Sequence, residues 1–183
     1  MSMDAAAFVA ALQEAVPDSA PESVPSLDLH PTIYIARDAV GAAARALRER
    51  RDLGFSLLAE LTAVDFWPRE PRYELVYILV SPEQRHRLRL KVRLHADDAH
   101  VVTVSDVWPA ANWLEREVWD LFGIAFDGHP DPRRLLMPED WEGYPLRKDY
   151  PVQIRMKPGA SEPVQVTAEE FRANLQKDRL SRQ

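Results

Sequence analysis

The sequence contains no cysteine among its 183 residues. Disulfide bonds, thiolate nucleophiles, cysteine-ligated zinc and iron–sulfur ligation by this chain are therefore excluded. Glycine is scarce as well, because only six are present, and none belongs to a phosphate-cradling loop. Any redox centre that works with this chain must be carried by a partner.

Long apolar runs and a strong charge of one sign are also missing. No run approaches the roughly 20 residues of a transmembrane helix, so we expect no direct membrane insertion. The start, "MSMDAAAFVAALQEAV", lacks a basic segment before its apolar run, so we expect no secretory signal. A net charge of −6 gives no support to a general nucleic-acid role. With 46% hydrophobic residues, we expect a soluble, cytoplasmic, folded protein.

The first 29 residues predict a helix and a proline-rich linker. Asp4 is a suitable N-cap for an amphipathic helix over residues 4–16, and four prolines lie within residues 17–31. A short strand, "TIYIA", follows, and Asp38 is placed to cap a second helix.

Strand patterns dominate the centre of the chain. "YELVYILV" and "HRLRLKVRL", joined by the turn "SPEQR", predict an antiparallel hairpin. "FSLLAELTAVDFW" fits either a strand or a buried helix, and "VVTVSDV" offers another strand. This order favours an α+β fold, with a mostly antiparallel sheet and packed helices in a domain over residues 30–123. A long extended C-terminal arm over residues 124–151 and a tail over residues 152–183 follow it.

Basic residues alternate with apolar ones between Arg85 and Arg93. The alternation predicts a half-buried strand with a solvated cationic face. Binding of nucleic acid is the alternative, but this face lacks the aromatic platform of a single-strand binder. Such charges would also protect an edge strand from pairing with another sheet.

A helix is predicted from Pro109 to about Phe122, with Gly123 as its left-handed stop. Glu115 and Glu117 fall at opposite edges of its apolar stripe. They therefore diverge and make a poor general acid–base pair.

The opposite face of this helix mixes aromatic and charged residues. Trp113 lies there with Trp119 near it, and Arg116 and Asp120 have the i, i+4 spacing of a surface ion pair. Large aromatics beside arginine are typical of interface centres. This pattern therefore favours a protein–protein interface over an ordinary solvent-exposed helix face.

The stretch "HPDPRRLLMPEDWEGYPLRKDYP", residues 129–151, has neither helical nor strand periodicity and is long for a structureless segment. His129 and Asp131 alone make no metal site, since catalytic zinc needs three protein ligands, so we expect a hydrogen-bonding structural histidine. A stand-alone hydrolase that uses Glu115, Glu117, Asp120 and His129 is the competing hypothesis. The diverging side chains argue against it.

The run from Glu115 to Pro151, "EREVWDLFGIAFDGHPDPRRLLMPEDWEGYPLRKDYP", closely resembles the signature of the C subunit, the 30-kDa family, of respiratory complex I, the proton-pumping NADH:quinone oxidoreductase. The upstream "ELTAVDFW" and the hairpin are similar to this family too, so the resemblance covers roughly residues 30–151. Pro132 departs from the family, which more often has leucine there.

The resemblance implies a non-catalytic scaffold subunit of the peripheral arm, on the cytoplasmic side of the cell membrane. Such a subunit holds no cofactor, while FMN, iron–sulfur clusters and quinone lie in partner subunits. It docks mainly on the D subunit of the complex and lies near the B subunit, with the quinone pocket between those two. An equivalent subunit of a membrane-bound hydrogenase or another quinone-reducing complex is the alternative.

We expect no catalytic, cofactor-binding or metal-binding residues in this chain. The arm is expected to lie extended along the D subunit, with its basic residues against acidic groups there, and to depend on the partner for its order. The predicted interface consists of side chains from the helix and the arm: Trp113, Glu115, Arg116, Glu117, Trp119, Asp120, His129, Arg133, Arg134, Trp141, Tyr144, Arg147, Lys148, Asp149 and Tyr150.

Overall fold

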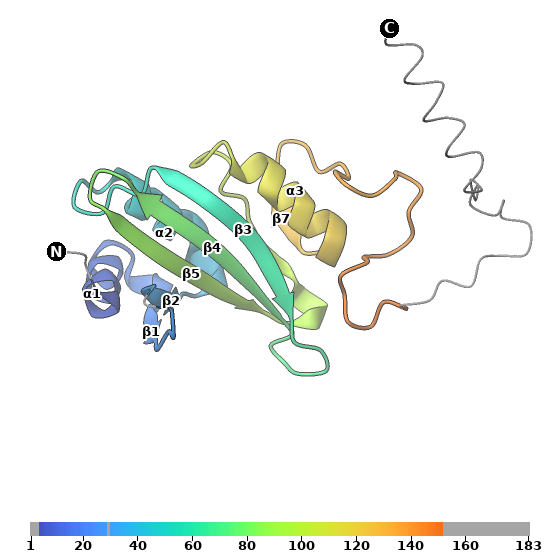
Figure 1. The fold of residues 1–183 in the computed structure, drawn as a ribbon, viewed down its shortest axis with the longest axis horizontal. Coiled ribbons are helices and arrows are strands. Elements are labelled where there is room, and N and C mark those ends of the chain that lie inside the picture. Colours follow the sequence, from blue (N-terminus) through green and yellow to red (C-terminus); the bar gives the residue numbers. More distant parts are fainter. Residues whose placement is uncertain (1–3, 29, 152–183) are drawn as a thin grey trace, which may run out of the picture. The chain divides into compact units, whose positions relative to one another are not determined.

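A five-stranded sheet forms the centre of the fold (Figure 1). The computed structural model describes residues 4–28 and 30–151. The strands have the order β1-β2-β5-β4-β3, and only the β2–β5 pair is parallel. Their bounds are β1 (Glu22–Val24), β2 (Thr32–Tyr34), β3 (Leu57–Asp65), β4 (Tyr73–Ser81) and β5 (His86–Leu94). The predicted α+β class with a mostly antiparallel sheet is confirmed.

Three α-helices contribute to one core on the inner face of the sheet. They are α1 (Ala5–Ala15), α2 (Val40–Glu49) and α3 (Ala111–Phe122). Their buried apolar residues pack with the inner-face residues of β3, β4 and β5 in a single cluster. A separate parallel pair joins β6 (His100–Val102) to β7 (Ala125–Asp127), just after α3. The stretch "VVTVSDV" therefore supplies only a short strand, outside the main sheet.

The N-terminal region is more ordered than the proline pattern predicts. Asp4 caps α1 as expected, because its carboxylate accepts from the N–H of Ala7 at 2.9 Å. The expected linker contains β1, which pairs with β2 at the edge of the sheet. The predicted cap by Asp38 is wrong, because a 3₁₀ turn precedes α2 and Ala39 occupies the N-cap without a side-chain hydrogen bond.

The hairpin of β4 and β5 is confirmed, and "FSLLAELTAVDFW" supplies β3. β5 is not an edge strand, because it lies between β2 and β4. Its outer residues are partly neutralised: Lys91 lies 2.7 Å from Glu74, and Arg89 pairs with Asp28. A local alternation fixes which face is buried, but it does not fix the neighbours of a strand.

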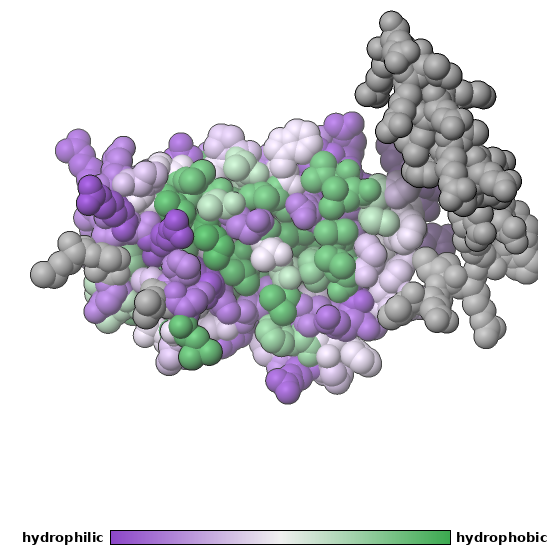
Figure 2. Space-filling model, in the orientation of Figure 1, coloured by the Kyte–Doolittle hydropathy of each residue, from purple (hydrophilic) through white to green (hydrophobic). Residues whose placement is uncertain are grey.

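The outer face of the sheet points away from the shared core. No helix lies on it within residues 4–28 and 30–151 (Figure 1). The space-filling view shows hydrophobic surface on this face, over the region of β3 and β4 (Figure 2).

Candidate partner-binding surface around helix α3 and the arm

Helix α3 ends where the sequence predicts. Gly123 has a φ of +73°, and its N–H donates to the carbonyl of Trp119 at 2.8 Å. A Cβ at this glycine would lie 2.5 Å from both Arg147 and Tyr144 of the arm. The glycine is therefore needed both for the left-handed turn and for the close approach of the arm.

Asp120 ties the arm to α3. Its buried carboxylate accepts from the N–H groups of Leu135, Leu136 and Met137 at 3.0, 2.7 and 2.8 Å. The guanidinium of Arg134 lies 2.6 Å away. Burial alone would raise the pKa of Asp120, but these donors outweigh burial and hold the pKa below its usual value.

Arg116 fixes the preceding part of the arm. Its side chain donates to the carbonyls of Arg133 and Arg134 at 2.9 and 3.0 Å, and its guanidinium lies 5.1 Å from the ring centre of Trp113. The predicted surface ion pair of Arg116 with Asp120 is wrong. Both side chains are buried beneath the arm, and each one binds arm residues instead.

Glu115 binds the segment that precedes α3, and its carboxylate lies 3.8 Å from Nε2 of His129. Its carboxylate accepts from the N–H of Val104 at 2.7 Å and from the hydroxyl of Thr103. Because the carboxyl is fully buried, its pKa is raised to about 7. Glu117 makes no side-chain hydrogen bond or ion pair with any described residue, so the two glutamates do not share a site.

His129 is a hydrogen-bonding structural histidine, as predicted. Its Nε2 lies 3.0 Å from the carbonyl of Asn112, and its Nδ1 accepts from the N–H of Asp131 at 3.0 Å. These contacts fit a neutral ring with the proton on Nε2. Within the described part of the chain, no group of three or more metal-ligating side chains occurs.

A small cavity lies between Glu115, His129 and the arm. Its volume is about 100 Å³, and its lining includes Trp119, Phe126 and Pro132. Pockets for cofactors or drug-sized ligands usually enclose roughly 300–1,000 Å³. This cavity is therefore too small for a substrate of that size.

The second half of the arm packs on the end of α3. The N–H of Leu146 donates to the carbonyl of Leu121 at 3.1 Å, and Arg147 donates to the carbonyl of Phe122 at 2.5 Å. The guanidinium of Arg147 lies 4.4 Å from the ring centre of Tyr144. The arm is thus held on its own chain and does not hang free.

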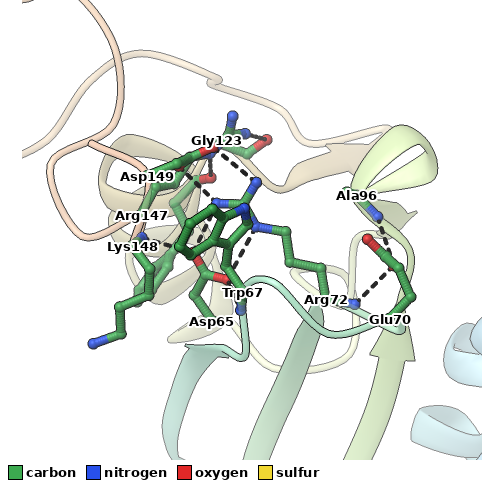
Figure 3. Close-up of polar contacts among 10 residues, drawn as sticks. Asp65, Trp67, Glu70, Arg72, Ala96, Gly123, Arg147, Lys148 and Asp149 are labelled. Atoms are coloured by element: carbon green, nitrogen blue, oxygen red, sulfur yellow. Dashed lines mark hydrogen bonds and ion pairs between the residues drawn. The ribbon is translucent and has the colours of Figure 1, made fainter. Parts of the chain in front are cut away.

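An arginine between two aspartates fixes the end of the arm to the sheet (Figure 3). Arg72 lies 2.9 Å from Asp65 and 2.7 Å from Asp149. Asp65 also accepts from the N–H groups of Lys148 and Trp67, at 2.8 and 2.9 Å. Burial opposes ionisation of Asp65, but these donors prevail and lower its pKa to about 2.

Neither Arg72 nor Asp65 was among the predicted site residues. One signal was present: Asp65 shares the inward face of its strand with Leu61 and Ala63, and a carboxylate at such a position needs a buried cation. Nothing in the local sequence identified Arg72 as that cation.

The predicted interface residues all lie on helix α3 or on the arm that packs against it. Several have partners within the chain: Arg134 has Asp120, Arg133 has Asp131, and Asp149 has Arg72. The aromatic rings of Trp141 and Tyr150 stack on each other, with centres 6.5 Å apart. The role of these side chains in binding a partner remains a prediction.

Large apolar side chains nevertheless stay exposed on this structure. Trp113 on α3 is 59% exposed, and Leu136 and Leu146 on the arm are 59% and 49% exposed. Their backbone is fixed by the buried contacts beneath them. No described helix is long and apolar enough to cross a membrane.

Comparison with known proteins agrees with this fold. The family model described as "Respiratory-chain NADH dehydrogenase, 30 Kd subunit" matches residues 33–155. A protein of Roseiflexus sp. (strain RS-1), named as the C subunit of NADH-quinone oxidoreductase, is 43% identical over 83% of this chain and 87% of its own length. The protein of the same name from Geobacter sulfurreducens is 50% identical over 67% of this chain and 75% of its own length.

A relative from Acidiphilium cryptum, named as the C/D subunit of NADH-quinone oxidoreductase, is 48% identical over 67% of this chain and 22% of its own length. Among solved structures, the trypsin-resistant fragment (1-134) of Nqo5 is similar with a TM-score of 0.56 and 32% identity, over 66% of this chain and 95% of that one. A chain of an archaeal membrane-bound sulfane sulfur reductase gives a TM-score of 0.66 and 31% identity, over 80% of this chain and 85% of that one. The protein therefore belongs to the family of the 30-kDa subunit of respiratory-chain NADH dehydrogenase, whose relatives are named as the C subunit of NADH-quinone oxidoreductase.

Proposed function

We propose that this chain is a non-catalytic scaffold subunit in the peripheral arm of a proton-translocating NADH:quinone oxidoreductase. It docks on the D subunit, near the B subunit, on the cytoplasmic side of the membrane. Electrons pass from NADH through FMN and iron–sulfur centres to quinone, all of which are bound by partner subunits. The absence of cysteine from the chain supports this division of labour.

The main support for this proposal is that the arm has a fixed backbone but exposes the apolar side chains of Leu136 and Leu146. Arg116 and Asp120 bind main-chain groups of residues 133–137, so the backbone of Leu136 is held in a defined position on α3, the helix that also carries Trp113. A surface ordered before docking loses little conformational freedom when a partner binds. Exposed aromatic and aliphatic anchors on such a surface are what a binding partner uses.

The buried charges near α3 also support a structural role. Arg116 and Asp120 hold the arm, and Glu115 holds the backbone at Val104. Each of these groups is therefore occupied by the fold itself. The relative with the C/D name supports the D subunit in the role of partner, because the C and D names are combined in one protein there.

A second candidate is the equivalent subunit of another membrane-bound complex. The likeness to a chain of the archaeal sulfane sulfur reductase complex favours this alternative. In that case the docking role is the same, and the electron donor or acceptor of the assembly differs.

Co-purification with a tagged D subunit tests the proposal. Truncation of the arm is a poor probe, because it would leave Asp120 and Arg116 without their partners and would remove Asp149 from Arg72. Trp113→Ala removes an exposed anchor and its contact with the guanidinium of Arg116, while the hydrogen bonds of Arg116 to the arm stay in place. Such anchors typically contribute about 2 kcal/mol or more, or roughly 30-fold in affinity. We expect Trp113→Ala to lose most of the bound D subunit when the concentration is limiting.

The matched control is Leu27→Ala, which truncates another exposed apolar side chain, in the turn before β2. It should retain the D subunit to the wild-type level. Wild-type recovery with Trp113→Ala, measured on a protein with an unchanged circular dichroism spectrum, contradicts docking through this surface.

A further inference from the structure

The outer face of β3 and β4 is apolar although the described chain leaves it uncovered. Leu57 is 47% exposed and Val64 is 38% exposed. The strand register places Val76, Ile78 and Val80 of β4 on the same face. Hydrophobic surface is visible there in Figure 2. Exposed apolar patches of this kind mark binding surfaces in soluble proteins.

The sequence of β4 is also apolar on both faces of the strand. An antiparallel strand with one solvated face alternates apolar and polar residues, whereas a strand covered on both faces is apolar throughout. "YELVYILV" has a charged residue only at Glu74. Ile78 and Val80 are only partly buried on the outer face, whereas Val76 is already buried by its neighbours, with 8% of its surface exposed.

The neighbouring strand β5 adds positive charge to this apolar surface. Arg87 and Arg93 are exposed, and no described carboxylate lies within 4 Å of either guanidinium. Arg89 and Lys91 are paired within the chain, with Asp28 and Glu74. Arg93 also stacks on Tyr34, with its guanidinium 3.8 Å from the ring centre, so both arginines lack a described carboxylate but only Arg93 has a described aromatic partner.

A depression joins the apolar and basic parts of this face. It has a volume of about 340 Å³, and its lining includes His30, Ala59, Ile78, Val80 and Arg87. A side chain that enters it would contact apolar groups on one side and a guanidinium on the other.

We propose that the outer sheet face is a second docking surface, for an amphipathic helix of a partner subunit with an apolar stripe and acidic residues beside it. The stripe covers Leu57, Val64 and Ile78, and the acidic residues pair with Arg87 and Arg93. A helix on this face would complete a sheet with helices on both sides. This surface is separate from the proposed docking surface on α3, which packs against the inner face of β3.

Charge argues against occupants from the same chain. The tail after Pro151 has more basic than acidic side chains, so its excess positive charge disfavours a position beside Arg87 and Arg93. A second copy, docked face to face, would bring the same excess of positive charge to the contact. An acidic, apolar partner segment is complementary to both parts of the face.

The absence of native cysteine permits a direct test with single-cysteine variants of the full chain. Leu57→Cys and Val64→Cys place a thiol on the outer face, and Ala63→Cys places one on the buried inner face as a matched control. Maleimide labelling rates are compared between the free chain and the assembled complex. We expect both outer thiols to react at least 10-fold more slowly in the complex, while Ala63→Cys stays unreactive in both.

A photo-cross-linker on Val64→Cys then identifies the occupant by mass spectrometry. The proposal requires a peptide of another subunit that contains apolar residues and Asp or Glu. Arg87→Glu should reduce this cross-link at least 10-fold, whereas Arg48→Glu, the same change on an exposed position of α2, should leave it unchanged. Equal labelling rates in free chain and complex, or a cross-link to residues 152–183, to a second copy or to nucleic acid, would overturn it.

Discussion

Asp120→Asn tests how the arm is held on helix α3. The asparagine oxygen can still accept from the N–H groups of residues 135–137, but its amide group cannot accept from Arg134. Removal of one partner of a buried ion pair typically costs about 3–5 kcal/mol, and the retained oxygen offsets part of this. We therefore expect the contact between arm and helix to weaken by roughly 3 kcal/mol, which corresponds to about a 100-fold larger population of the detached arm.

Native-state trypsin digestion measures this population, because cleavage in a locally opened segment follows the equilibrium population of the open form. Cleavage after Arg133, Arg134 and Arg147, followed by mass spectrometry, should be about 100-fold faster in Asp120→Asn, by the same reasoning. The matched control is Glu117→Gln, a neutralised carboxylate on the same helix without a described side-chain partner. Cleavage of Asp120→Asn within about threefold of this control would show that Asp120 does not hold the arm, because so small a change implies well under 1 kcal/mol.

Three further substitutions have defined outcomes. Because the pKa of Glu115 rises from 4.5 to about 7 on folding, stability falls as pH rises through this interval, so Glu115→Gln should raise the melting temperature at pH 8 and leave it nearly unchanged at pH 4. Gly123→Ala should lower the urea midpoint more than Gly128→Ala does: both positions have positive φ, but the added Cβ meets Arg147 and Tyr144 at 2.5 Å in the first case and lies 3.7 Å from Thr103 in the second. Arg72→Met should cost about 3–5 kcal/mol in chemical unfolding, because buried Asp65 loses its cation, and an added Asp65→Asn should restore part of this stability.

Local patterns in the sequence predict α3 well and its environment poorly. The apolar stripe and Gly123 define the helix and its end, because both are features of consecutive residues. The same stripe placed Arg116 and Asp120 in solvent, whereas both are buried. Their cover comes from residues 133–137, and a helical period carries no information about a segment that folds back from farther along the chain.

In the sheet, too, local sequence patterns predict burial but not the neighbouring strands. Alternation in "HRLRLKVRL" correctly separates buried from exposed residues of β5. The parallel pairing with β2 brings together segments more than fifty residues apart, so β5 becomes an inner strand of the sheet. Strand order is a property of tertiary contacts, and these are not encoded in the period of one strand.

Cross-linking from the arm in the assembled complex tests whether the arm contacts the D subunit. Leu136→Cys places the only thiol of the chain on an exposed arm position, where a photo-reactive maleimide can be attached in the assembled complex. We expect the main cross-linked peptide to belong to the D subunit. Cross-links found only within this chain, or only to other subunits, would contradict it.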